Sequence, residues 1–278
     1  MWILPKPLLA DALADIAKVI KANKGSLDTA DATMLDTLYH TYDKNNGTVS
    51  LADNNVFSSA KQNVLLASYD KTQKGGKLVY IRQELLANVD YCPMCGIMPP
   101  SQLDHQMPKV EYKSLSVCRL NLVPTCGVCN NKKRTGKPSD FVHPYYDYGL
   151  RGIPFFDVEI HSNPNTHRMS WKFKINKAII QDPTLADKVE KQIGVIKLFR
   201  RLTKEINILL SDILSVGIKF QEQLDIILEY EYNKYKRYGQ NDWRVVFLEA
   251  LRNSNSFTIN EAMVYSKSIK PINGGVNA

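Results

Sequence analysis

Apolar side chains recur at helical spacing over two long parts of the chain. In residues 1–87 the clearest example runs through Leu9, Leu13 and Ile16, where apolar positions fall every three to four residues. The same periodicity returns over residues 183–267, which are rich in Ile and Leu. Such positions share one face of a helix, so both parts are predicted to be helical and to bury that face. The helices predicted in the second part span residues 188–218, 221–237 and 242–253.

A different pattern separates the two helical parts. Residues 88–150 concentrate turn residues, prolines, cysteines and basic residues. After them, residues 155–160 and 169–175 alternate apolar and polar side chains, which predicts a β-hairpin with a long loop. The predicted fold class is therefore mostly α with a small α+β core. The three predicted regions are 1–87, 88–150 and 151–278.

Composition indicates a soluble protein in a reducing compartment. Apolar residues make up 44% of the chain and charged residues 23%, which are ordinary values for a globular protein. No run of about 18 uncharged apolar residues occurs, so we expect no membrane-spanning helix and no membrane partner. Lys6 interrupts the apolar start, which favours a folded helix over a secretion signal. A cytoplasmic location is expected, where paired cysteines favour metal over disulfide bonds.

The net charge of +8 and the isoelectric point of about 9.1 indicate a polyanionic partner. Charge alone is a weak indicator, because many basic proteins bind no nucleic acid. Here, however, seven basic residues fall within residues 109–137 against one acidic residue, Glu111. Phosphate contacts from such side chains are sequence-independent and weaken with salt, whereas the simpler interpretation is a solvated basic loop. The predicted nucleic-acid contacts are Lys109, Lys113, Lys132, Lys133, Arg134 and Lys137.

Four of the five cysteines form two pairs with the spacing C-x2-C-x30-C-x2-C, namely Cys92, Cys95, Cys126 and Cys129. Two such pairs suit one tetrahedral Zn²⁺, and four thiolates close its coordination shell, so the predicted zinc is structural. Four unrelated buried thiols would not require this spacing. Cys118 is left over and is predicted to be an ordinary buried cysteine.

The residues around these cysteines carry further polar groups in a fixed order. The pieces CPMC, LDHQMPK, RLNLVPTC and CGVCNNKK follow one another within residues 88–150. Together they resemble the zinc-knuckle branch of the HNH endonuclease family. The resemblance implies a central, treble-clef-like ββα-metal domain flanked by helical regions. It covers this segment only, and its motifs are specific in combination rather than singly.

The resemblance also implies a role for each matching residue. Asp104 and Asn130 would ligate a catalytic divalent cation, Mg²⁺ or Mn²⁺. His105 would be the general base for a water molecule that attacks phosphorus. Asn121 would tie the loop down and orient the imidazole of His105 through a hydrogen bond. The third letter of the motif is Asn rather than His in this chain, a variant common in the family.

Elementary chemistry is consistent with these roles. A histidine with a pKa near 6.5 can accept a proton at neutral pH, and general base catalysis typically contributes ~10²–10⁴-fold. A hard cation held by a carboxylate and an amide oxygen can neutralise a phosphate and its leaving group. Asp104 and His105 are adjacent, so in a regular strand they would point to opposite faces. The zinc would hold the helix near Cys126 against the strand that carries Asp104.

A softer resemblance extends beyond the core motif. The stretch FVHPYYDYG follows it at residues 141–149, and the whole arrangement looks like the HNH subunits of Septu-type and retron-associated anti-phage systems. In those systems an ATPase subunit regulates the nuclease, which implies an ATPase partner in a hetero-oligomer. Residues 206–227 are then a candidate docking surface, although packing within the chain is the simpler interpretation. His143 is a candidate contact to substrate or metal, although a histidine between proline and aromatic residues is more often structural.

Three function classes follow. The first is a DNA endonuclease that serves as a defence effector. The second is a homing or restriction-type nuclease, or one that acts on RNA. The third is a zinc module that binds nucleic acid or a partner without catalysis, which would not require Asp104, His105, Asn121 and Asn130 together.

Overall fold

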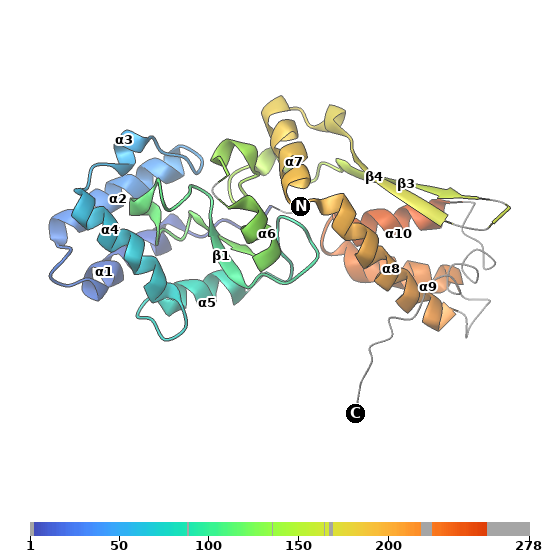
Figure 1. Ribbon diagram of the computed structural model, residues 1–278, viewed down its shortest axis with the longest axis horizontal. Coiled ribbons are helices and arrows are strands. Elements are labelled where there is room, and N and C mark those ends of the chain that lie inside the picture. Colours follow the sequence, from blue (N-terminus) through green and yellow to red (C-terminus); the bar gives the residue numbers. More distant parts are fainter. Residues whose placement is uncertain are drawn as a thin grey trace. The chain divides into compact units, whose positions relative to one another are not determined.

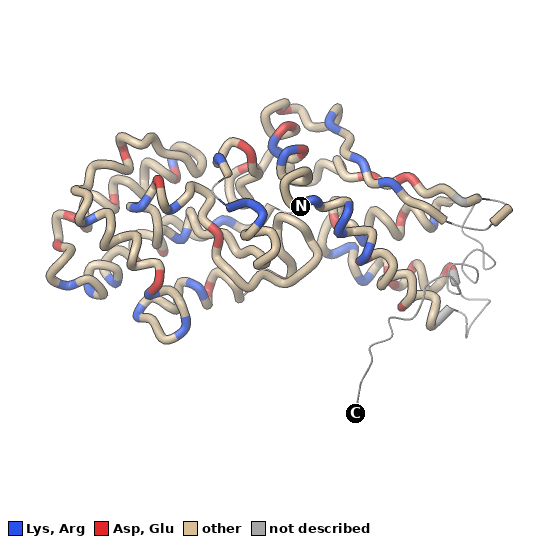
Figure 2. Tube along the Cα trace, viewed as in Figure 1, with Lys and Arg blue, Asp and Glu red and all other residues tan. Residues whose placement is uncertain are grey.

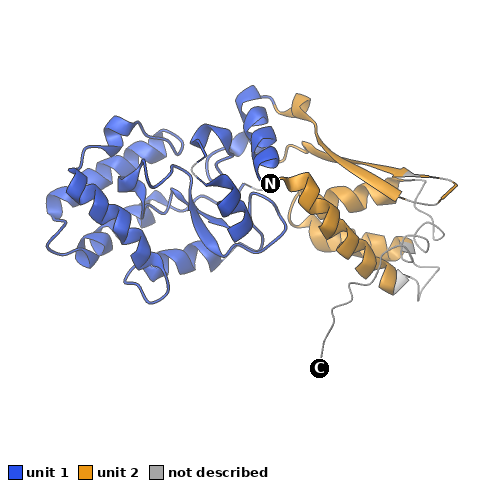
Figure 3. Ribbon diagram, viewed as in Figure 1, with its two compact units in different colours: residues 1–151, 181–196 blue, residues 152–180, 197–278 orange. Residues whose placement is uncertain are grey.

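The computed structural model describes residues 3–87, 89–134, 136–163, 165–166, 169–217 and 224–254, and it is mostly helical with two small antiparallel sheets (Figure 1). The chain divides into two compact units (Figure 3). Unit 1 consists of residues 1–151 and 181–196, and unit 2 of residues 152–180 and 197–278. The fold class predicted from hydrophobic periodicity is confirmed at this level. Among the described residues, no helix combines the length and apolarity that a membrane span requires.

The first part of unit 1 is a set of helices whose starts are encoded locally. The Asp28 side chain caps its helix by accepting a hydrogen bond from the backbone N–H of Asp31. The Asp31 side chain in turn accepts a hydrogen bond from the backbone N–H of Asp28. Ser50 and Asp53 form a second box of the same kind. The elements are α1 (Leu9–Ala22), α2 (Thr29–Lys44), α3 (Leu51–Asn54), α4 (Ser59–Ser68), the 3₁₀ turn η1 (Tyr69–Thr72) and α5 (Val79–Ala87).

The second part of unit 1 is a hairpin followed by a helix. Strand β1 (Gln102–His105) pairs antiparallel with β2 (Leu122–Thr125), with Asp104 opposite Val123 and His105 opposite Leu122. Helix α6 (Gly127–Lys133) begins immediately after β2. Short 3₁₀ turns fill the connections: η2 (Lys113–Leu115), η3 (Pro138–Asp140) and η4 (Tyr148–Leu150).

These two parts share one hydrophobic core. Leu35, Leu65 and Ile81 from the helices are fully buried in the same cluster as Leu115 and Leu122 from the hairpin segment. A buried ion pair adds to the packing: the Arg119 guanidinium donates to Asp15 Oδ2 at 2.6 Å and to Glu84 Oε2 at 2.9 Å. Regions 1–87 and 88–150, which the sequence pattern separates, therefore belong to one unit.

Helix α7 (Pro183–Val195) completes unit 1 from further along the chain. Its Gln192 side chain accepts a hydrogen bond from the backbone N–H of Val142 at 3.1 Å. Its lysines form ion pairs, Lys188 with Asp147 at 3.0 Å and Lys191 with Asp140 at 2.9 Å. The chain first crosses to unit 2 after residue 151, and residues 181–196 return to unit 1.

Unit 2 contains the predicted β-hairpin. Strand β3 (Phe156–Ser162) pairs antiparallel with β4 (Met169–Ile175), and the Phe156 and Phe173 rings stack with centroids 5.1 Å apart. The remaining elements are η5 (Lys177–Ile179), α8 (Leu198–Gly217), α9 (Leu224–Lys236) and α10 (Trp243–Asn253).

The long helix predicted over residues 188–218 is in fact two helices. The break falls between α7 and α8, where Lys197 has φ +51°, a left-handed conformation that an uninterrupted helix does not contain. The candidate docking surface at residues 206–227 is partly core, although Ile208 and Ile226 within it are exposed. Ile206 and Leu210 are fully buried and Ile213 nearly so, while residues 218–223 lie outside the described part of the chain. The apolar side of α8 is core.

Candidate functional site

The four paired cysteines converge on one point in unit 1. Their sulfur atoms all lie within 4.8 Å of one another, and all four residues are buried. The Cys95 and Cys126 sulfurs are 3.8 Å apart. A tetrahedral zinc with Zn–S bonds of roughly 2.3 Å places its sulfurs roughly 3.8 Å apart. The donor set and the spacing therefore fit one structural Zn²⁺, as the sequence predicted.

Local backbone geometry explains how the cysteines meet. Gly96 follows Cys95 with φ +67°, and its N–H donates to the Cys92 carbonyl at 2.8 Å, which closes a tight turn. Cys126 is the N-cap of α6, and Cys129 lies on the first turns of that helix. A bound metal would thus fasten α6 to the loop before β1. Cys118 stands apart from this cluster, and burial raises the pKa of its thiol to about 12.

A pocket of about 210 Å³ is formed mostly by residues that lie, in sequence, between the two cysteine pairs or just after the second pair. It brings together three of the predicted catalytic residues. Asp104 and His105 end β1, and both line this pocket despite being adjacent in the strand. Asn130 reaches it from α6. The other lining residues are Tyr69, Leu103, Pro108, Lys109, Val110 and Arg134.

His105 is held in a defined orientation. Its Nε2 lies 2.9 Å from the Ser116 carbonyl, which can only accept, so Nε2 carries the proton and Nδ1 keeps a lone pair. Burial lowers the pKa of His105 to about 3, and the positive charges of Lys109 and Lys133 act in the same direction. The imidazole is therefore neutral at pH 7, with an unprotonated Nδ1.

Asp104 has a partner that the sequence did not assign. The Lys133 ammonium donates to Asp104 Oδ2 and to the His105 carbonyl, both at 2.7 Å, and Lys133 is only 3% exposed. Burial raises the pKa of Asp104, and the charge of Lys133 opposes that shift. Lys133 is thus a buried internal partner, and its predicted role as a nucleic-acid contact is wrong.

Asn130 retains the atom that a cation would need. Its amide nitrogen donates to Gln102 Oε1 at 2.7 Å, which fixes the side chain and leaves the amide oxygen outside that bond. Hard divalent cations bind carboxylate and amide oxygens. The residues Asp104 and Asn130 therefore fit a Mg²⁺ or Mn²⁺ site in chemistry, on facing elements of one pocket.

Asn121 is fully buried and has a different hydrogen-bonding role from the predicted one. Its amide oxygen accepts from the Met107 N–H at 2.7 Å, and its amide nitrogen donates to the Met107 carbonyl at 3.2 Å and, more weakly, to Leu115 at 3.4 Å. It thus ties down the loop between β1 and β2 as expected. The predicted hydrogen bond to His105 is absent among the described residues, and Ser116 orients the imidazole instead.

His143 does not line the pocket, and it contacts this loop through Tyr42 and Asn121. Its Nδ1 accepts from the Tyr145 N–H at 3.2 Å, so Nε2 carries the proton toward the Tyr42 oxygen at 3.0 Å. The Tyr42 hydroxyl in turn donates to Asn121 Oδ1 at 3.1 Å. Burial keeps the pKa of His143 well below its usual value. The structural interpretation of His143 is the one the geometry supports.

Tyr69 is a pocket residue that sequence reasoning missed. It comes from η1 in the N-terminal helices, its hydroxyl donates to the Leu103 carbonyl at 2.7 Å, and its ring meets His105 edge-on with centroids 4.5 Å apart. The Lys109 ammonium lies 4.4 Å from the centre of the same ring. No motif marks Tyr69, because its role depends on packing between segments distant in sequence.

The predicted basic contacts separate into groups. Lys109 and Arg134 line the pocket. Lys113 donates to Asn63 Oδ1 at 2.9 Å on the surface. Lys132 is half-buried and Lys137 is exposed. Arg119, counted in the basic stretch, is instead the buried partner of Asp15 and Glu84.

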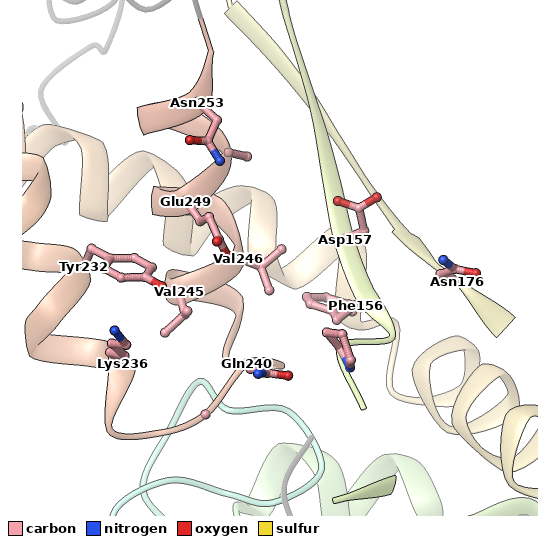
Figure 4. A pocket seen from close by; sticks show the side chains of 13 residues that line it. Phe156, Asp157, Asn176, Tyr232, Lys236, Gln240, Val245, Val246, Glu249 and Asn253 are labelled. Carbon is pink, nitrogen blue, oxygen red and sulfur yellow. The ribbon is translucent and has the colours of Figure 1, made fainter. Parts of the chain in front are cut away.

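A larger pocket, of about 690 Å³, lies within unit 2 between β3 and the helices α9 and α10 (Figure 4). Its charged lining residues are Asp157, Lys236 and Glu249. Its described lining includes neither histidine nor cysteine. Of these two pockets, the smaller one in unit 1 is the one that contains a histidine beside a carboxylate.

Comparison with known proteins gives one limited similarity. Protein ea31 of Escherichia phage lambda is 32% identical to this chain over 74 residues, which is 24% of this chain and 25% of that protein. No protein-family model matches the chain, and no solved structure matches it. The matched stretch thus spans about a quarter of the phage protein.

Proposed function

We propose that this chain is a metal-dependent endonuclease of the HNH type that hydrolyses DNA phosphodiester bonds. The observation that carries the proposal is the convergence of Asp104, His105 and Asn130 on one pocket. These residues come from the last strand residues of β1 and from α6, next to a four-cysteine cluster. This β–β–α order with its zinc knuckles is the arrangement that the family resemblance implies.

The chemistry assigned to each residue follows from its contacts. His105 Nδ1, with its lone pair kept free by the Nε2–Ser116 bond, takes a proton from the attacking water. Asp104 and Asn130 would hold the divalent cation, which would supply charge neutralisation at the phosphate and the leaving oxygen. Lys109 and Arg134 line the same pocket and would bind the non-bridging phosphate oxygens.

The setting of the reaction is a further part of the proposal. A role in anti-phage defence, with an ATPase subunit as partner, rests on the resemblance to Septu-type and retron-associated nucleases. The buried apolar side of α8 is core, and the exposed apolar side chains left for such a partner in this region are Ile208 on α8 and Ile226 and Tyr230 on α9. An RNA substrate and a non-catalytic zinc module are the outcomes that the following experiment separates from DNA cleavage.

Supercoiled plasmid should be nicked or linearised in the presence of Mg²⁺ or Mn²⁺, and His105→Ala should abolish this at unchanged zinc content. Loss of a general base predicts a decrease of about 10²–10⁴-fold. His40→Ala is the matched control, because His40 is an exposed histidine of the same unit. Cleavage of single-stranded RNA alone would move the substrate to RNA. If neither substrate is cleaved, even with the neighbouring gene products added, the remaining interpretation is a zinc module that binds nucleic acid or a partner without catalysis.

A further inference from the structure

The outer side of α8, in unit 2, carries concentrated positive charge. Lys197, Arg200, Arg201 and Lys204 fall within eight residues, and residues 191–204 contain no acidic residue. Lys197, Arg200 and Lys204 are exposed. Figure 2 shows the Lys and Arg positions gathered at the start of this helix. We refer to Lys197, Arg200 and Lys204 as the α8 basic face.

Within the described residues, the three cations of the α8 basic face have no ion-pair partner, unlike lysines of α7. On α7, Lys188 and Lys191 each form an ion pair with an aspartate of unit 1. Within the described part of the chain, no side chain of the α8 basic face forms an ion pair or a hydrogen bond. The face therefore presents uncompensated charge to solvent.

The placement of these charges opposes local stability. The first turn of α8 contains no acidic residue, although the amino end of a helix favours negative charge and disfavours positive charge. Lys197, immediately before the helix, also adopts φ +51°, a conformation that Gly or Asn adopts more readily. A sequence selected only for stability would favour Gly or Asn at residue 197.

The opposite side of α8 determines the class of partner. Leu202, Ile206 and Leu210 are fully buried, and among the described side chains of α8 Ile208 is the one large apolar side chain that is exposed, so the helix offers a lipid surface no continuous apolar face. Amphipathic helices that bind membranes need such a face in addition to their charge. A partner of the α8 basic face is therefore recognised mainly through charge, as the nucleic-acid backbone is.

The spacing of the side chains suits a phosphate backbone. Arg200 and Lys204 are four residues apart on α8, a rise of roughly 6 Å. Phosphates of one DNA strand succeed one another every ~3.4 Å along the duplex axis, so these two side chains would span about two phosphate intervals.

We propose that the α8 basic face binds the phosphate backbone of nucleic acid, as a second contact surface separate from the pocket of unit 1. This surface is distinct from the proposed nuclease site, because it lies in unit 2 and binding to it requires no catalysis. It gives unit 2 a function of its own, which is to hold the polyanion while unit 1 acts on it.

The test is binding of a fluorescently labelled 20-base-pair DNA duplex to the full-length chain, measured by anisotropy without added Mg²⁺ or Mn²⁺. The variant Lys197→Ala, Arg200→Ala, Lys204→Ala should bind at least tenfold more weakly. Its salt slope should fall by about 2–3, since each neutralised phosphate contributes about 0.9. The control Lys21→Ala, Lys74→Ala, Lys77→Ala removes equal charge from exposed sites of unit 1.

Equal losses in the two triple variants would overturn the proposal, because overall charge would then explain the binding. Unchanged binding by the α8 variant would overturn it as well. Anionic phosphatidylglycerol vesicles serve as a second probe, and loss of vesicle binding with retained DNA binding would point to a membrane instead. The measurement does not depend on cleavage, so failure of the proposed nuclease activity and failure of this inference are separate results.

Discussion

The buried pair Lys133–Asp104 is the residue-scale feature that most changes the interpretation of the site. A lysine in the run Asn130-Asn131-Lys132-Lys133 looks like a surface phosphate ligand, yet Lys133 is buried and paired. The position of Lys133 along the helix already indicates that it is buried. Lys133 lies four residues after the buried Cys129 and so shares its face of α6. Lys132, one position earlier, lies on another side.

Removing the ammonium should leave a buried carboxylate without a partner. We expect Lys133→Met to lower the free energy of unfolding by about 3–5 kcal/mol, measured by urea denaturation. The double variant Asp104→Asn, Lys133→Met should recover part of this loss, because it removes the unpaired charge. Added Mn²⁺ should raise the melting temperature of Lys133→Met more than that of the wild type. If both variants lose equal stability, the ion pair is not the cause.

Tyr69 tests whether the N-terminal helices take part in the site. Tyr69→Phe loses one hydrogen bond to Leu103, worth about 1 kcal/mol, and keeps the ring beside His105. Cleavage should therefore persist in Tyr69→Phe and fall more than tenfold in Tyr69→Ala. Plasmid nicking at matched zinc content measures both. Equal activity in the two variants would mean that the ring does not position His105.

At the scale of the element, the hairpin β1–β2 and helix α6 depend on the cysteine cluster. α6 has seven residues, too short to be stable alone, and Cys126 caps it without a side-chain hydrogen bond. A zinc ion would supply the missing restraint, since structural zinc contributes directly to folding.

The purified chain should contain about one Zn²⁺, released by chelators with loss of the native fold. Cys126→Ser should reduce zinc content and destabilise unit 1. Cys118→Ser is the control, because Cys118 is buried away from the cluster, and this variant should keep its zinc. Metal analysis and thermal unfolding measure both. Retention of zinc by Cys126→Ser would contradict the four-thiolate site.

Sequence predicted the features that depend on short spacing and missed those that depend on distant packing. The cysteine pairs and the β3–β4 hairpin follow from local patterns. Asp104, His105 and Asn130 were named through the family resemblance, and the alternation of a regular strand does not predict that Asp104 and His105 line one pocket. Asn121 was assigned to the loop correctly, but its bond to Tyr42 joins residues 79 positions apart. No local pattern encodes such a contact, and the same applies to Tyr69.

At the scale of the whole molecule, the stability of the protein should depend on pH through His143. Burial depresses the pKa of His143 in the folded state, whereas the unfolded pKa is about 6.5. The unfolded chain therefore binds the extra proton as pH falls below about 6.5. The stabilisation is complete above that pH and is lost on acidification.

A fully buried neutral histidine predicts a loss of about 1.4 kcal/mol per pH unit below 6.5. His143→Gln removes the contribution of His143, leaves that of His105, whose pKa burial also lowers, and keeps a side chain that can donate to Tyr42. Urea unfolding between pH 5 and 7 should thus give a shallower slope for His143→Gln than for wild type. Identical slopes would show that His143 does not titrate with unfolding.

The division of unit 1 into residues 1–151 and 181–196 has a consequence for synthesis and for proteolysis. As the ribosome releases the chain, unit 1 must wait for the β3–β4 hairpin to emerge before α7 arrives to complete it. A fragment ending at residue 151 would lack the partners of Asp140 and Asp147. The chain crosses between the units three times, after residues 151, 180 and 196. One cut within residues 152–180 would therefore give two fragments, each of which contributes residues to both units.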